Sequence, residues 1–477
     1  MLNKIAINSI YNVLGLGLPM IAAIFSIPAL ITELGEARFG LLAIIWSVVS
    51  YFGLLDLGLG RALTQFISSS RLRKRSVELK NFIGMAMYSL LFLGFFGGIL
   101  MGLICFYSIN LIKTIPNMPE ARLASALIAI SIPAIMISSG YRGILEAYHK
   151  FAIINLIRVP SGIWTFAGPL LVLKWWGNSL VFISIFLVLG RYLTNFFFAY
   201  FVKKTIHSYG FNRKIDLKNL KPLLTTGGWM TLSNLVSQFM GIIDRLLIGA
   251  IISASAVAFY VTPQEIVTKL LLVPGAVTLV LFPIFSAKFL SSKEIEILFV
   301  KSTKIIITIV FPAAFFIGIF SDEILNSWLN QNFAEHSALI MRIFTIGIVI
   351  NSVAQVAFVL LQSAGLSKVT AIINIIQLPV FICILIFCAK RYGIEGAAYA
   401  WLLRLIIDAI MMFFALNRSF KNINNSYIFK VLILILTIMT VSYQFIGGSV
   451  LMLKLMFFGV FILTSSIVFF RYKTYFI

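Results

Sequence analysis

Long apolar runs separated by short polar stretches follow one another along almost the whole chain. Most of the runs are long enough for an α-helix to cross the hydrocarbon core of a bilayer, which takes roughly 20 residues. The pattern therefore predicts about fourteen membrane-spanning helices. Their expected bounds are residues 10–31, 39–59, 82–107, 123–140, 151–173, 180–201, 224–252, 257–285, 305–320, 338–361, 369–389, 394–416, 431–446 and 450–470.

Composition agrees with this pattern. Hydrophobic residues make up 60% of the chain and charged residues 11%, whereas soluble domains average about 45–50% and about 25%. A soluble fold could not bury so much apolar surface, so we expect an all-α integral membrane protein. The three cysteines, Cys105, Cys383 and Cys388, lie in apolar runs and predict neither a disulfide framework nor a metal site.

The formal net charge of +22 comes from basic residues in the loops between the apolar runs. Of the 38 lysines and arginines, 25 fall in one alternating set of loops, 7 in the other set and 6 inside predicted spans. Cytoplasmic loops are the ones enriched in basic residues. We therefore expect both termini to be cytoplasmic, and the charge does not point to nucleic acid.

One phrase occurs twice in the sequence. "AIINLIRVP" at 152–160 and "AIINIIQLP" at 371–379 share six of nine residues at an offset of 219. The offset covers six predicted spans, so both copies cross the membrane in the same direction. Parallel repeats of this kind predict two six-helix lobes, related by an axis along the membrane normal and rocking around a central cavity. We expect lobes at 1–222 and 223–422, with two additional helices in 423–477.

Several enzyme classes are disfavoured by the loops and motifs. No loop exceeds about two dozen residues, and neither G-x-x-x-x-G-K-[ST] nor H-E-x-x-H occurs. This leaves no room for a nucleotide-binding domain or a zinc protease site. We therefore expect no enzymatic activity and no catalytic residue.

Ionisable residues inside the predicted spans are the candidates for function, because charge within a membrane is costly and usually serves transport. The basic ones are Arg158, Arg191, Arg245, Lys269, Arg342 and Arg404, and the acidic ones are Asp56, Asp244, Glu265 and Asp408. Basic residues exceed acidic ones by two, which suits an anionic cargo better than a cationic one.

Spacing suggests which of these charges neutralise one another. Residues four apart share a helix face, so Glu265 can bridge to Lys269, and Arg404 to Asp408, with no role in transport. Asp244 and Arg245 are adjacent and point in different directions, so Arg245 is expected to need another partner.

The remaining charges have separate interpretations. Arg342 lies near an outer edge, where it can extend to the interface or serve function. Asp56 lies near Arg61, with which it can form a bridge, or it can titrate. Arg158 aligns with the neutral Gln377 of the second copy, which suggests a role specific to one lobe, with contact to a lipid headgroup as the alternative.

Three segments resemble a known family. These are "LGEARFGLLAIIWSVVSYFGLLDLGLGRALTQFIS" at 34–68, "IDRLLIG" at 243–249 and "YGIEGAAYAWLL" at 392–403. They resemble the O-antigen and exopolysaccharide flippases (Wzx-type), whose superfamily includes multidrug and toxin extrusion antiporters and lipid II flippases. The resemblance implies transport of an oligosaccharide, joined by pyrophosphate to a polyprenol, from the cytoplasmic to the outer leaflet of a bacterial cytoplasmic membrane.

This resemblance assigns expected roles to the buried charges. Pyrophosphate or acidic sugars would contact Arg245, Lys269, Arg158 and Arg61, and a coupling proton or sodium ion would be carried by Asp244, Glu265 or Asp56. No cofactor is expected beyond a proton or sodium gradient. Expected partners are the lipid-linked oligosaccharide, membrane lipids, and a polymerase and chain-length regulator of the same pathway, with no nucleic acid.

Two alternatives stay open. The first is a multidrug antiporter of the same superfamily, which the excess of basic residues disfavours. The second is a membrane glycan polymerase, which would need a large external loop with carboxylates. The most acidic external loop, 321–336, holds only Asp322, Glu323 and Glu335.

Overall fold

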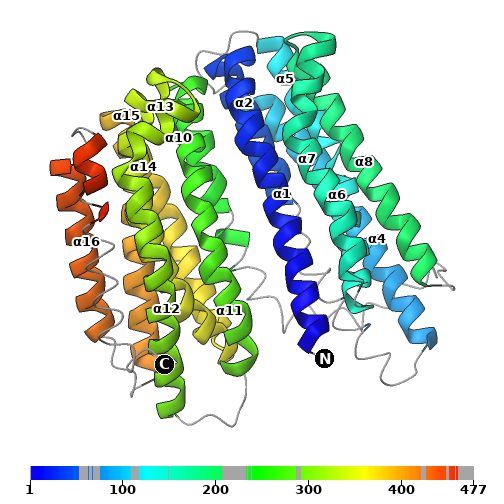
Figure 1. Ribbon diagram of the computed structural model, residues 1–477. Helices are drawn as coiled ribbons and strands as arrows, with labels where there is room; N and C mark the ends of the chain where they lie inside the picture. Colours follow the sequence, from blue (N-terminus) through cyan, green and yellow to red (C-terminus); the bar gives the residue numbers. More distant parts are fainter. Residues whose placement is uncertain are drawn as a thin grey trace. The chain divides into compact units, whose positions relative to one another are not determined.

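A computed structural model describes residues 2–52, 63, 67, 76–108, 118–148, 150–206, 233, 235–237, 239–285, 292–420, 426–446, 451–456 and 458–459. This part of the chain is helical and contains no strand (Figure 1). Its helices are α1 (Leu2–Leu34), α2 (Glu36–Phe52), α4 (Ser76–Ser108), α5 (Met118–Ala129), α6 (Ile132–Ala147), α7 (Phe151–Trp176), α8 (Leu180–Thr205), α10 (Ala254–Thr268), α11 (Leu272–Phe285), α12 (Ser292–Ile319), α13 (Ser321–Trp328), α14 (Gln331–Ser363), α15 (Ser367–Ser419) and α16 (Ser426–Ile446).

Nine helices in the described residues are long and apolar enough to cross a membrane. The all-α membrane fold expected from the sequence is therefore confirmed. The chain divides into two compact units: unit 1 comprises Met1–Thr231 with Ser253–Ala258, and unit 2 comprises Leu232–Ile252 with Phe259–Ile477. The described residues of 423–477, where two additional helices are expected, belong to unit 2.

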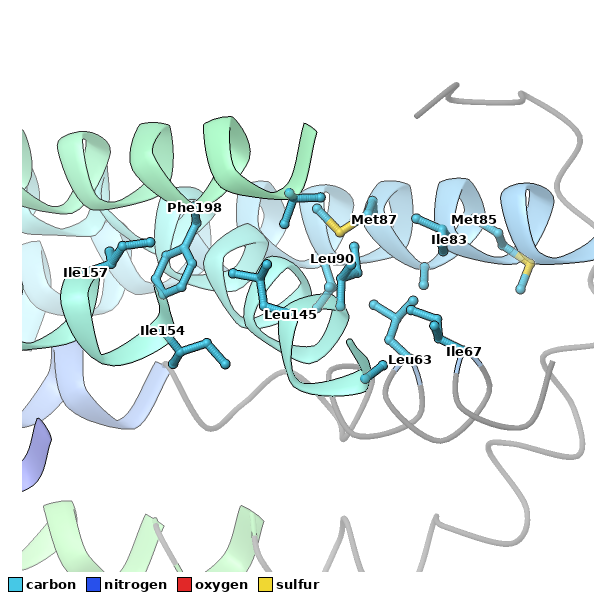
Figure 2. Packing of buried hydrophobic residues seen from close by; sticks show 14 residues of the cluster. Leu63, Ile67, Ile83, Met85, Met87, Leu90, Leu145, Ile154, Ile157 and Phe198 are labelled. Carbon is cyan, nitrogen blue, oxygen red and sulfur yellow. The ribbon is translucent and has the colours of Figure 1, made fainter. Parts of the chain in front are cut away.

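The core of unit 1 forms where α4, α6, α7 and α8 meet. Its buried side chains include Leu90, Leu145, Ile154, Ile157 and Phe198, and Figure 2 shows them pointing toward one another. Burying a side chain of this size stabilises the folded state by about 1.5–3 kcal/mol. The cluster holds the first two turns of α7 against α6 and α8.

The predicted span 123–140 lies within one candidate span, Pro119–Ala147, which a turn divides into α5 and α6. Ile130 and Ser131 form a turn between α5 and α6, and Pro133 occupies the first turn of α6. Proline fits a helix start because its missing N–H would be unbonded there anyway. The predicted span is therefore confirmed, with a turn inside it that the apolar run did not show.

Prolines also shape the eighth span, which lies mostly in unit 2. Pro263 inside α10 cannot donate to the carbonyl of Phe259, and Oγ of Ser337 on α14 donates to that carbonyl instead, over 2.8 Å. Further along, a 3₁₀ turn at Lys269–Leu271 separates α10 from α11. Pro274 cannot donate to the carbonyl of Leu270, which explains a break at this point.

The helix α15 contains two predicted spans, 369–389 and 394–416. They meet at Gly393, where φ is +61°, a value that glycine adopts without a steric cost. The connection between α7 and α8 in unit 1 also has a glycine at positive φ, Gly177 at +72°. The two copies of the repeated phrase thus lie on helices that each lead to a left-handed glycine.

The repeat also shows in the helices that each copy contacts. In unit 1, α7 packs along α1, and a side chain on Gly162 would overlap Pro19 of α1. In unit 2, Nδ2 of Asn374 donates to the carbonyl and hydroxyl oxygens of Ser233, at 3.1 and 2.9 Å. Ser233 belongs to the predicted seventh span, the repeat partner of the first.

The helix α16 packs on α12 and α14 (Figure 1). The hydroxyl of Tyr443 lies 3.0 Å from Oγ1 of Thr345 and donates to the carbonyl of Ala314 over 3.3 Å. Gly318 on α12 leaves the room that the tyrosine ring needs, because a side chain there would overlap it. Polar and steric fit therefore attach α16 to the core of unit 2.

The acidic segment 321–336, predicted to be an external loop, is largely helical. Asp322 and Glu323 lie in the first turn of α13, where carboxylates favour the positive end of the helix dipole. Arg342 pairs with Asp322 and donates to Oγ of Ser321 over 3.0 Å. Arg342 therefore has protein partners at this end of α14, and the choice between an interfacial and a transport role stays a prediction.

Candidate functional site: a charged cluster in unit 2

Four charged side chains come together between two helices of unit 2. Asp244 and Arg245 lie in the helical stretch 239–251. Glu265 lies on α10, and Lys269 begins the 3₁₀ turn that follows. Residues 260, 264 and 268 share one face of α10 because they are four apart, and this face meets the other helix. The packing of these two helices therefore brings two acids and two bases together close to a break in a membrane-spanning helix.

Asp244 is fully buried and accepts three hydrogen bonds. Its Oδ1 accepts from the backbone N–H of Arg245 over 2.8 Å. Its Oδ2 accepts from the Tyr260 hydroxyl over 3.1 Å and from Nε2 of Gln264 over 3.2 Å. A buried carboxylate without such donors would cost several kcal/mol, so these contacts make the position tolerable for an acid.

Arg245 is also buried, with 9% of its side chain exposed. Its Nε and Nη2 donate to Oε1 of Gln264, at 3.2 and 2.9 Å. Its Nη2 also donates to Oε1 of Glu265 over 3.1 Å. Arg245 therefore has partners on another helix, as its position next to Asp244 predicted, and its contact with pyrophosphate stays a prediction.

Glu265 joins the two cations of the cluster. One carboxylate oxygen pairs with Arg245 over 3.1 Å and the other with Nζ of Lys269 over 2.9 Å. The predicted Glu265–Lys269 bridge is therefore confirmed. Glu265 and Lys269 are 38% and 39% exposed, so this end of the cluster can be reached while Arg245 is covered.

The second predicted pair behaves differently. Asp408 accepts from Nε2 of Gln377 over 3.0 Å, and the guanidinium of Arg404 lies 5.1 Å from the centre of the Phe381 ring. Among the described residues, no ion pair joins Arg404 to Asp408, so that prediction was wrong. The Arg404 charge still acts electrostatically on both Asp244 and Asp408.

The other predicted site residues lie elsewhere. Arg158 is exposed on α7 in unit 1, and Asp56 and Arg61 lie outside the described residues. Within the part of the chain that the structure describes, no three His, Cys, Asp or Glu side chains could share a metal ion.

Sequence reasoning missed Tyr260 and Gln264. Tyr260 donates to Asp244, whereas Gln264 donates to Asp244 and accepts from Arg245. Their signal is present in the sequence. Residues 260 and 264 stand four apart in an apolar run, a spacing that places both on the helix face next to Glu265.

Comparisons with known proteins identify the family. Residues 5–289 match the family model described as "Polysaccharide biosynthesis protein". A Shigella flexneri protein named "Putative O-antigen transporter" is 30% identical over 85% of this chain and 96% of its own length.

Solved structures show the same fold at low identity. The lipid II flippase MurJ in an inward closed conformation gives a TM-score of 0.71 at 16% identity, covering 98% of this chain and 99% of its own. An inward-facing multidrug resistance MATE transporter of the MOP superfamily gives 0.69 at 15% identity, covering 86% and 98%. By its family model and its relative, the chain belongs to the polysaccharide biosynthesis protein family.

Proposed function

We propose that this chain is a flippase. It moves a polyprenyl-pyrophosphate-linked oligosaccharide from the cytoplasmic to the outer leaflet of a bacterial cytoplasmic membrane by alternating access. The observation that carries the proposal is membership of the polysaccharide biosynthesis family in a chain made largely of membrane-spanning helices. A sugar chain with two phosphates cannot cross hydrocarbon alone, because unpaired polar groups are costly there.

Within the charged cluster, Lys269 is the proposed contact for the pyrophosphate. Its side chain is 39% exposed, whereas that of Arg245 is 9% exposed. A phosphate oxygen would compete with Glu265 for the ammonium, since both form charge-assisted hydrogen bonds. Arg245 would hold Gln264 and Glu265 in place, and it could reach a phosphate only after they give way.

Competition for Lys269 suggests how transport couples to an ion gradient. When a phosphate binds the Lys269 ammonium, Glu265 keeps only Arg245 of its two cationic partners. A carboxylate with less compensation in a low-dielectric site favours a proton or a sodium ion. Asp244, with three donors, is the less available carrier. Asp56 and Arg61 stay predictions for the same process.

Orientation and partners complete the proposal. The distribution of basic loops supports cytoplasmic termini, so the headgroup would enter from the cytoplasm. The partners would be the lipid-linked oligosaccharide and membrane lipids, together with a polymerase and a chain-length regulator that receive the transported unit.

Complementation of surface-glycan production in a flippase-deficient strain tests the proposal. Lys269→Gln should reduce glycan at least about tenfold, because a hydrogen bond to a charged group contributes roughly 1.5–3 kcal/mol. Lys269→Arg should retain activity, since it keeps the positive charge. Arg418→Gln, an exposed arginine at the end of α15, is the matched control and should match the wild type.

The amount of folded protein distinguishes the structural role proposed for Arg245 from the substrate contact proposed for Lys269. Arg245→Gln should lower the amount of folded protein, because breaking a buried ion pair costs about 3–5 kcal/mol. Lys269→Gln should leave the amount unchanged. A wild-type chain that fails to restore glycan in any flippase-deficient strain would contradict the proposed transport.

A further inference from the structure

The two copies of the repeated phrase differ at one charged position. Arg158 in the first copy corresponds to Gln377 in the second. Gln377 is buried and donates to Asp408 over 3.0 Å. In unit 2, this position therefore has an anionic partner supplied by the chain itself.

The corresponding helices of unit 1, α7 and α8, supply no equivalent acid. The sequences of α7 and α8 contain neither aspartate nor glutamate, so no carboxylate on the helical pair that carries Arg158 can take the place of Asp408. Among the described residues, the acid whose charge favours the Arg158 guanidinium is Glu146 of α6. Glu146 is already paired with Arg142 over 3.7 Å, so within the described part of the chain this one carboxylate has two guanidinium groups, Arg142 and Arg158, to compensate.

The direction of Arg158 argues against a purely lipid-facing charge. The exposed apolar side chains of α7 include Leu156, Ile163 and Leu171. At 100° per residue, Arg158 lies roughly 160° around the helix from Leu156. It shares its face with Gly162, which touches Pro19 of α1. Arg158 is nevertheless exposed, so an external group can reach it on the side of α7 that faces α1.

Depth agrees with a headgroup site. Arg158 lies seven residues after the start of α7, about 10 Å along the helix. With the start of α7 at the interface that the basic loops predict, this distance puts Arg158 just inside the membrane, where a phosphate on a lipid can arrive with its chain still in the hydrocarbon.

From this asymmetry we propose that Arg158, together with Arg142, forms a phosphate-binding subsite in unit 1 for the pyrophosphate of a polyprenyl pyrophosphate. The ligand takes the place that Asp408 fills in unit 2. A guanidinium suits this task because it donates two parallel hydrogen bonds to phosphate oxygens. The subsite rests on the proposed function, since it names where that substrate's headgroup binds before or after the charged cluster of unit 2.

Binding to the purified full-length protein tests the subsite independently of transport. The protein is placed in phosphatidylcholine nanodiscs and titrated with geranylgeranyl pyrophosphate by native mass spectrometry. Arg158→Gln reproduces the residue of the second copy and should weaken binding about tenfold. Arg158→Lys should weaken it less. Lys174→Gln, at the other end of α7, is the matched control and should bind as the wild type does.

A gain-of-binding variant guards against misfolding as the cause. Glu146→Gln removes the shared carboxylate and should tighten binding, while Glu146→Gln combined with Arg158→Gln should lose that gain. Unchanged binding in Arg158→Gln, or no gain in Glu146→Gln, would overturn the subsite.

A second titration distinguishes the source of the phosphate. Phosphatidylglycerol in the nanodiscs should compete weakly and without dependence on Arg158. Equal, Arg158-dependent competition would show a site for bulk anionic lipid and overturn the proposal. Arg158-dependent binding in a chain that fails complementation would leave the phosphate subsite standing and refute the proposed transport instead.

Discussion

Nζ of Lys454 donates a hydrogen bond of 2.7 Å to Oε1 of Glu323. The lysine side chain is 2% exposed, and Oδ2 of Asp322 lies 3.6 Å from the same nitrogen. The sequence pattern places Lys454 on the external side, yet in the structure it is an interior group. It ties the helical residues after α16 to α13, so the C-terminal helices are held to unit 2 by charge as well as by apolar contact.

Removing the Glu323 carboxylate alone should therefore lower the stability more than removing the charges of both Glu323 and Lys454. Glu323→Gln leaves a buried ammonium with one carboxylate at 3.6 Å, and we expect destabilisation of about 3–5 kcal/mol. Glu323→Gln with Lys454→Met should recover much of this, because it buries no unpaired charge. The melting temperature of the detergent-solubilised protein measures both variants. A double variant less stable than Glu323→Gln would contradict the charge-pair explanation.

The break at Lys269–Leu271 should matter for transport rather than for stability. Pro274→Ala restores an N–H toward the carbonyl of Leu270 and removes a helix penalty of about 3 kcal/mol. We expect an unchanged or higher melting temperature. Glycan complementation should fall at least severalfold, because a continuous helix would change the direction in which the Lys269 side chain points.

Pro263→Ala is the control for that experiment. The carbonyl freed by Pro263 already accepts from Ser337, and α10 continues through this point. Transport should therefore stay close to the wild-type level. Full transport by Pro274→Ala would show that the break has no role in the transport cycle.

Cysteine labelling tests the predicted orientation. In a chain without Cys105, Cys383 and Cys388, Ser69→Cys, Ser208→Cys and Ser292→Cys should react with a membrane-impermeant reagent only after the cells are permeabilised. Ser179→Cys, between α7 and α8, should react from outside intact cells. Labelling of Ser208→Cys in intact cells would reverse the assigned orientation and the span count before it.

Apolar run length determined the membrane fold from sequence, because a helix that crosses a bilayer requires a run of fixed length and little else. Local spacing also determined the Glu265–Lys269 bridge, since residues four apart meet on any helix. The same rule was wrong for Arg404 and Asp408. There Gln377, from the other half of α15, donates a hydrogen bond to the Asp408 carboxylate, and the Arg404 guanidinium lies over the Phe381 ring.

The partners of Arg245 were decided by tertiary structure. The sequence shows that Asp244 cannot face it, and no local rule identifies Gln264 and Glu265, which lie 19 and 20 residues further along. Lys454 and Glu323 are 131 residues apart, and their contact depends on how α13 packs near the C-terminal helices. Helix periodicity is a local property of the chain, whereas the compensation of a buried charge depends on which helices pack together.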